Sequence, residues 1–188
     1  MKRASSRSAV PLRGSIWAVA LLVLLAVGAT AVSAADSQRV PLGHGALSAP
    51  KGSWEAIAVP RGSILIDVFE ADGAVSQTYG KSYGDVPPRG LRAYGFRPGG
   101  LPTRHGLLAG ATGERIRKVK IYLKGGATRS VRTIASPADW EVANRLYALG
   151  FTIPASYKAN LRVVTKIEGL DSAGRLISTL RAVPTGSY

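Results

Sequence analysis

The sequence contains no cysteine, and this absence removes several chemistries at once. A chain without thiols forms no disulfide bond, has no thiol nucleophile and offers no Cys ligand to a metal ion. Histidine is almost as scarce, because His44 and His105 are the only two and both lie in Gly-rich surroundings far apart in the chain. A metal site needs several ligands that neighbouring groups hold rigidly. We therefore expect no metal centre and no cofactor.

Negative charge is also scarce, with 11 Asp and Glu residues against 25 Lys and Arg residues. All 11 carboxylates but only 21 of the basic residues follow residue 35, which leaves a net charge of +10 there (21 minus 11). Nothing in the sequence marks a cleft that would hold two carboxylates for general acid–base catalysis. The positive charge favours an anionic partner, unless this is one of the many exported proteins that are simply basic.

Long apolar runs are absent except at the N-terminus, where IWAVALLVLLAV spans residues 16–27. Four basic residues and no acidic one precede it, and small residues with cleavage sites after Ala34 or Ala35 follow it. This order is typical of a secretory signal peptide. The alternative is an uncleaved anchor over residues 16–32, at the lower edge of the length that spans a bilayer. Both interpretations predict a secreted or extracytoplasmic protein.

The remaining chain suits one domain, and its length allows a hydrophobic core without disulfide bonds. Residues 36–60 are rich in Gly, Pro, Ser and Ala, so we expect a flexible tether there. We place a β-sandwich domain at residues 61–184 and a short tail at 185–188. Residues 1–35 form the signal peptide or membrane anchor.

Alternating apolar residues and turn signals predict about seven strands. The Asp72-Gly73 pair predicts a hairpin over residues 64–79, and Gly125-Gly126 predicts another over 118–134. A short strand at 91–96 and a last hairpin around the DSAG turn complete the pattern. Evenly spaced short strands without a long helix are typical of an antiparallel β-sandwich.

One stretch, SPADWEVANRLYALGFTIP, carries two patterns. Ser136, followed by a proline and an acidic residue, predicts the start of a helix over residues 137–144. Strict alternation from Tyr147 onwards predicts a strand instead. We expect a short helix and then a strand, with a single helix that ends at Gly150 as the alternative. The fold class we predict is a mainly β, antiparallel Ig-like β-sandwich with one short helix, preceded by the N-terminal signal or anchor helix.

A family resemblance supports this fold. The motif V-x-I-Y-L-K-G-G, a basic return strand and then I-E-G-L-D-S-A-G-R-L-I resemble exported Ig-like domains of actinobacteria, over residues of about 107–182. In those domains a strand, an Asp-x-x-Gly turn and a closing strand recur in the same order. The resemblance implies a fold and an exported location, and it implies no activity.

The basic residues of the 118–134 hairpin form the candidate binding site. In RKVKIYLK, alternation places Lys118, Lys120, Tyr122 and Lys124 on one face of a strand and the apolar residues on the other. Arg132 joins them from the return strand. Such a row could bind an anionic cell-wall polymer, a membrane surface or an envelope protein. Nucleic acid is not expected, because one tyrosine offers little stacking and the protein is exported. Alternatively, the lysines protect a sheet edge from aggregation.

Two further patterns are weaker. The five residues from Gly80 to Gly84 match the G-x-S-x-G motif around Ser82, but the prolines that follow leave no room for the helix that a nucleophile elbow needs. Five aromatic residues could form a platform for carbohydrate, although such residues more often lie in a core: Trp54, Tyr79, Tyr83, Tyr94 and Phe96.

The sequence therefore favours an exported, non-enzymatic binding or adhesion module of the cell envelope. The alternative is an envelope hydrolase or transferase with an unrecognised Ser or carboxylate site. A third interpretation is a membrane-tethered accessory subunit whose partner buries the hairpin edge.

Overall fold

A computed structural model describes residues 39–48, 51–60, 62–97, 104–153 and 163–181. The chain divides into two units, Met1–Gln38 and Arg39–Tyr188. The fold reported below is that of the second unit. The predicted signal or anchor segment and the predicted tail at 185–188 lie outside the described residues.

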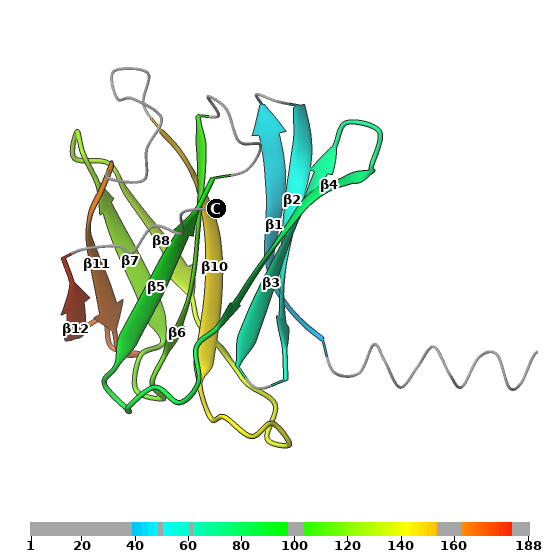
Figure 1. Cartoon of the computed structure of the whole chain (residues 1–188). Coiled ribbons are helices and arrows are strands. Elements are labelled where there is room, and N and C mark those ends of the chain that lie inside the picture. The colour runs from blue at the N-terminus through cyan, green and yellow to red at the C-terminus, as the bar shows by residue number, and fades with distance from the viewer. Residues whose placement is uncertain (1–38, 49–50, 61, 98–103, 154–162, 182–188) are drawn as a thin grey trace, which may run out of the picture. The chain divides into compact units, whose positions relative to one another are not determined.

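The described chain is mainly β, and all of its strand pairings are antiparallel, as predicted. The first of three four-stranded sheets has the order β1-β2-β3-β4. Each of its strands pairs with the next along the chain (Figure 1). Its strands are β1 (Val40–Ser48), β2 (Lys51–Val59), β3 (Ser63–Glu70) and β4 (Val75–Ser82).

The other two sheets interleave in sequence. The second sheet has the order β5-β6-β10-β9, and the third has the order β12-β11-β7-β8. The second sheet consists of β5 (Leu91–Phe96), β6 (His105–Thr112), β9 (Ile134–Ala135) and β10 (Arg145–Thr152). The third consists of β7 (Lys118–Leu123), β8 (Thr128–Arg132), β11 (Val164–Leu170) and β12 (Leu176–Leu180).

The second sheet has a hydrophobic core on each of its faces. In β10, Leu146 and Ala148 belong to a cluster shared with the first sheet, whereas Tyr147 and Leu149 belong to a cluster shared with the third sheet. Strand β6 divides in the same way, with Leu107 in the first cluster and Leu108 in the second. Successive side chains of a strand point to opposite faces. This double burial explains why both strands are almost continuously apolar, and each fully buried leucine contributes about 1.5–3 kcal/mol.

The prediction of a flexible tether at residues 36–60 is wrong, because β1 and β2 occupy most of it and the compact unit begins at Arg39. The glycines of β1 are there for packing: a Cβ at Gly45 would lie 2.7 Å from Nε1 of Trp54, its cross-strand partner. In β2, Ala56 and Ala58 are completely buried. The Gly and Ala residues of this segment pack closely in β1 and β2, and their abundance gave the segment a composition typical of a loop.

The predicted short helix at residues 137–144 is also wrong, because these residues form a turn and then an extended segment. Ser136 does not cap a helix; its amide and hydroxyl groups both donate to the carbonyl oxygen of Asn144, at 2.9 and 2.8 Å. Burial then alternates, with Trp140, Val142 and Asn144 buried and the residues between them exposed. That period of two belongs to an extended chain.

The predicted strand that follows, the 91–96 strand and all three hairpins are confirmed as β10, β5, β3–β4, β7–β8 and β11–β12. Gly73, Gly125, Gly126 and Gly174 of the hairpin turns have φ between 79° and 87°, a region that L-residues rarely occupy. The described chain has twelve strands rather than about seven, because β1, β2, β6 and β9 were not foreseen.

Candidate functional site

The structure places the predicted row on the outer face of the third sheet. In β7, Val119 and Ile121 are completely buried in the second core, so Lys118, Lys120 and Tyr122 point to the opposite face. Lys124 follows the strand and is exposed. Arg132 ends β8 directly opposite Lys118. The expected alternation along the hairpin is therefore confirmed.

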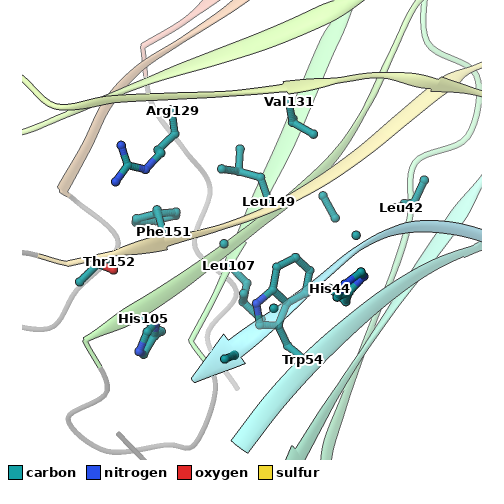
Figure 2. Close-up of a pocket in the computed structure, with 15 residues that line it drawn as sticks. Leu42, His44, Trp54, His105, Leu107, Arg129, Val131, Leu149, Phe151 and Thr152 are labelled. Atoms are coloured by element: carbon teal, nitrogen blue, oxygen red, sulfur yellow. The ribbon is translucent and has the colours of Figure 1, made fainter. Parts of the chain in front are cut away.

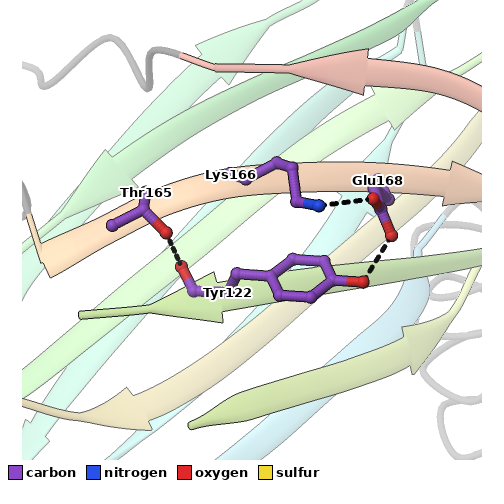
Figure 3. A network of polar contacts seen from close by, with 4 residues as sticks. All are labelled: Tyr122, Thr165, Lys166 and Glu168. Carbon is purple, nitrogen blue, oxygen red and sulfur yellow. Dashed lines mark hydrogen bonds and ion pairs between the residues drawn. The ribbon is translucent and has the colours of Figure 1, made fainter. Parts of the chain in front are cut away.

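A carboxylate lies in the middle of this row. Glu168 of β11 is the cross-strand partner of Lys120. Its Oε2 atom accepts a 2.6 Å hydrogen bond from the Tyr122 hydroxyl, and its Oε1 atom accepts one of 2.7 Å from Nζ of Lys166 (Figure 3). The Lys166 ammonium lies 4.0 Å from the centre of the Tyr122 ring, and the Lys120 ammonium lies 4.8 Å from it. Tyr122 therefore contacts two cations through its ring and one anion through its hydroxyl.

These contacts fix the charge of Glu168. The hydrogen bonds from Lys166 and then Tyr122 lower the pKa of the Glu168 carboxyl group. The hydrogen bond to Glu168 raises the pKa of Lys166. Both groups are therefore charged at neutral pH, and they neutralise each other in the centre of the face. Sequence reasoning missed this pair, because only the long-range pairing of β11 with β7 brings it to the row.

The uncompensated positive charge is concentrated at one end of the row, where β7 begins and β8 ends. Lys118 and Arg132 border a pocket of about 590 Å³, and Arg117 and Arg145 line the same pocket. The turn from Asp171 to Gly174 closes one side. Within the described chain, the side chains of Arg117, Lys118 and Arg132 make no hydrogen bond or ion pair. Sequence reasoning placed Lys118 and Arg132 in the binding row and did not group them with Arg145.

Arg145 is fixed by a single threonine. Its Nε atom donates to the Thr133 hydroxyl at 2.8 Å, and Nη2 donates to the Thr133 carbonyl oxygen at 2.7 Å. Thr133 is buried, and its hydroxyl group donates a 2.8 Å hydrogen bond to the carbonyl oxygen of Ile116. Burial, and then the positive charge of Arg117, lower the pKa of Arg145. The guanidinium group is therefore held in place by neutral acceptors and lies close to a second cation.

A second pocket, of about 390 Å³, contains both histidines. His44 and His105 line it together with Trp54, and Figure 2 shows the indole ring between the two imidazoles in this view. Burial lowers the pKa of His105, so its imidazole is neutral at neutral pH. A Cβ at Gly150 would lie 3.0 Å from the indole, as close packing on β10 requires. Trp54 is only 6% exposed, which makes it part of a wall rather than an open platform.

The other candidate aromatics do not form a carbohydrate platform either. Tyr83 and Phe96 are each 3% exposed and belong to the first core, where the Tyr83 hydroxyl donates to the carbonyl oxygen of Ala109 at 2.9 Å. Tyr79 and Tyr94 pack against that core. These residues stabilise the junction between the first and second sheets.

The G-x-S-x-G match does not have the geometry of a nucleophile elbow. Ser82 ends β4 and pairs with Ser63, and residues 83–90 form no helix behind it. The pocket that His105 lines does not include Ser82. The described residues also contain no group of three or more Asp, Glu or His side chains that could hold a metal ion. No helix among them is long and apolar enough to cross a membrane.

No family model, no curated protein and no solved structure matches the chain. The resemblance to exported Ig-like domains therefore stays a prediction, and function must be argued from the geometry of the chain itself.

Proposed function

We propose that this protein is an exported, non-enzymatic binding module of the cell envelope, with an Ig-like β-sandwich architecture. Its binding surface is the outer face of the third sheet, formed by Lys118, Lys120, Tyr122, Lys124 and Arg132. The ligand class is an anionic polymer. Export is supported by the signal-like N-terminal sequence, and the ligand class is supported by the net charge of +10 (21 minus 11) that follows residue 35.

The observation that carries the proposal is the pairing of Lys118 with Arg132 at the end of the hairpin. Like charges directly opposite each other weaken a sheet. Lys118 and Lys120 lie on β7, which pairs with β11 on one side and with β8 on the other, so these lysines do not protect a free sheet edge. An anion that bridges the two side chains turns this repulsion into attraction.

The arrangement of the cations favours a polymer over a membrane. Lys118 and Lys120 lie on the same face of β7, about 6.6 Å apart along the strand. The Glu168 carboxylate lies beside Lys120, so a flat anionic membrane would also face a negative group. A polymer can follow the cations from the pocket along β7 and pass beside the carboxylate.

Cosedimentation tests the proposal. The protein is purified from cells that express the full-length chain and is mixed with bacterial cell walls or with anionic liposomes, in salt from ~0.05 to ~0.5 M. The variant carries Lys118→Gln, Lys120→Gln and Lys124→Gln. The control carries Arg39→Gln, Lys51→Gln and Arg104→Gln, which removes the same charge from exposed positions outside the third sheet.

We expect the wild type and the control to sediment with cell walls at low salt and to be released as salt rises, and the variant to stay in solution. Equal loss of binding in the variant and the control would show that binding depends on net charge and not on this surface, which would overturn the proposal. Sedimentation with liposomes alone would replace the polymer by a membrane surface. No sedimentation of the wild type at low salt would overturn the proposal and return the search to a protein partner or an enzyme.

A further inference from the structure

The four cations of the pocket come from separate parts of the chain. Arg117 precedes β7, Lys118 begins it, Arg132 ends β8, and Arg145 begins β10. The register brings them together: Lys118 pairs with Arg132, and Arg145 pairs with Ala135 just beyond Thr133. The pocket therefore lies where the ends of the second and third sheets meet.

Among the described residues, one carboxylate lines the pocket, that of Asp171, and it already accepts hydrogen bonds. Oδ2 of Asp171 accepts a 2.8 Å hydrogen bond from Nε of Arg175, which does not line the pocket. Its Oδ1 atom accepts the amide hydrogens of Ala173 and Arg175, both at 2.9 Å. Four cations therefore face a single carboxylate whose hydrogen bonds belong to the β11–β12 turn.

Arg145 presents a fixed donor to this space. Thr133 accepts the hydrogen bonds from Nε and Nη2 of Arg145, and no described residue accepts a hydrogen bond from its Nη1 atom. Because the Thr133 hydroxyl donates to Ile116, it acts only as an acceptor for Arg145 and fixes the plane of the guanidinium group. Because Arg145 is already held in place, little side-chain entropy is lost when an anion binds it.

We propose that this pocket binds one phosphate group, with Arg145 as the pre-positioned anchor and with Arg117, Lys118 and Arg132 as the closing cations. Guanidinium groups match oxyanions with paired N–H···O bonds, and several of them at once suit a tetrahedral anion better than a planar carboxylate. The volume of about 590 Å³ exceeds that of one phosphate and leaves room for the groups on either side of a phosphodiester. The inference rests on the proposed function in one respect, since it names phosphate as the repeating anion of the polymer.

The test uses inorganic phosphate and the protein purified from cells that express the full-length chain. Isothermal titration calorimetry and thermal unfolding are measured at pH 7.5 with phosphate, and with sodium chloride at matched ionic strength. We expect phosphate, and not chloride, to raise Tm, and the rise to continue as the phosphate concentration increases above Kd. Arg132→Gln and Lys118→Gln should each raise the Kd for phosphate about tenfold, which corresponds to ~1.4 kcal/mol.

Arg145 requires two variants, because it also contributes hydrogen bonds to the fold. Arg145→Lys keeps the charge and loses the planar group, whereas the double variant Arg117→Gln with Arg132→Gln leaves the Arg145–Thr133 contact untouched. We expect both to bind phosphate more weakly than the control Arg39→Gln with Lys51→Gln. Equal Tm shifts with chloride, or a double variant that binds phosphate as tightly as the control, would overturn the inference.

The two proposals fail separately. If phosphate binds and cell walls do not, the pocket is an anion site and the polymer function is wrong. If cell walls bind and phosphate does not, the polymer is held by the lysine row and the pocket assignment is wrong.

Discussion

Tyr122 and Glu168 are 46 residues apart in the chain, and a 2.6 Å hydrogen bond joins them on the outer face of the third sheet. With Lys166 on the second carboxylate oxygen, this contact divides a face that looks uniformly basic in sequence. Its centre is neutralised, and its excess charge lies at the end where Lys118 meets Arg132. The divided face leads to the first prediction.

Substitution of Glu168 by Gln should strengthen binding to anionic polymer. The change removes the carboxylate that forms an ion pair with Lys166 and leaves the charge of that lysine free to act on the face. Because the site is near the surface, we expect a modest gain of about two- to fivefold in affinity. Salt-dependent cosedimentation measures it, with Glu55→Gln on the exposed part of β2 as the control. A Glu168→Gln variant that binds no better than the Glu55→Gln control would contradict the role of Glu168 in dividing the face.

Stability should fall at acid pH through two carboxyl groups. Hydrogen bonds from Lys166 and Tyr122 lower the pKa of Glu168, and hydrogen bonds from the amide and side chain of Arg175 lower that of Asp171. A carboxyl group with a lowered folded-state pKa stabilises the protein above its unfolded-state pKa, about 4, and this contribution is lost as the pH falls through the folded-state value.

Thermal unfolding between pH 7 and pH 2.5 measures this effect. Glu168→Gln and Asp171→Asn should each make Tm less dependent on pH below about 4. Tm curves that keep the wild-type slope in both variants would assign the acid sensitivity to other groups.

Asn144→Ala should destabilise the loop that joins the first sheet to the second. Asn144 is buried; its Oδ1 atom accepts the Val86 amide hydrogen at 3.0 Å, and its Nδ2 atom donates to the Gly84 carbonyl oxygen at 2.5 Å. The variant leaves a buried amide without a partner, which costs about 1–3 kcal/mol in the free energy of unfolding. Chemical denaturation measures this loss. Ser136→Ala, which removes one of two donors to the Asn144 carbonyl oxygen, should cost less.

Gly110→Ala should test the double burial of the second sheet. A Cβ there would lie 2.1 Å from the carbonyl oxygen of Arg92 and 2.4 Å from the Tyr147 hydroxyl, which donates to that same oxygen at 3.0 Å. We expect a loss of about 1–3 kcal/mol from overpacking. The control is Gly80→Ala in β4, where a Cβ meets only the movable end of Leu65 at 3.3 Å. Equal denaturation midpoints for the two variants would be the contrary result.

The sequence predicted the elements whose causes are local. Asp72-Gly73 and Gly125-Gly126 give hairpin turns because their glycines adopt positive φ at little cost. The alternation in β7 appears directly in the burial of Val119 and Ile121. In both cases the residues within a few positions along the chain are sufficient to predict the local structure.

Prediction failed where small residues pack against distant ones. Gly45 of β1 looks like a loop residue until Trp54 lies against it. Ser136 has the features of a helix cap, yet its hydroxyl bonds to Asn144, which closes the loop. Local propensity is a weak prior, and tertiary contacts override it.

The sequence alone determined the mainly β class, the hairpin positions and the row from Lys118 to Lys124. Only the tertiary structure decided which charges meet. The pairing of β11 with β7 brings Glu168 to the centre of the row, and the start of β10 brings Arg145 to its end. These neighbours are fixed by the burial of two cores on a shared sheet, which is a property of the whole chain and leaves no local pattern.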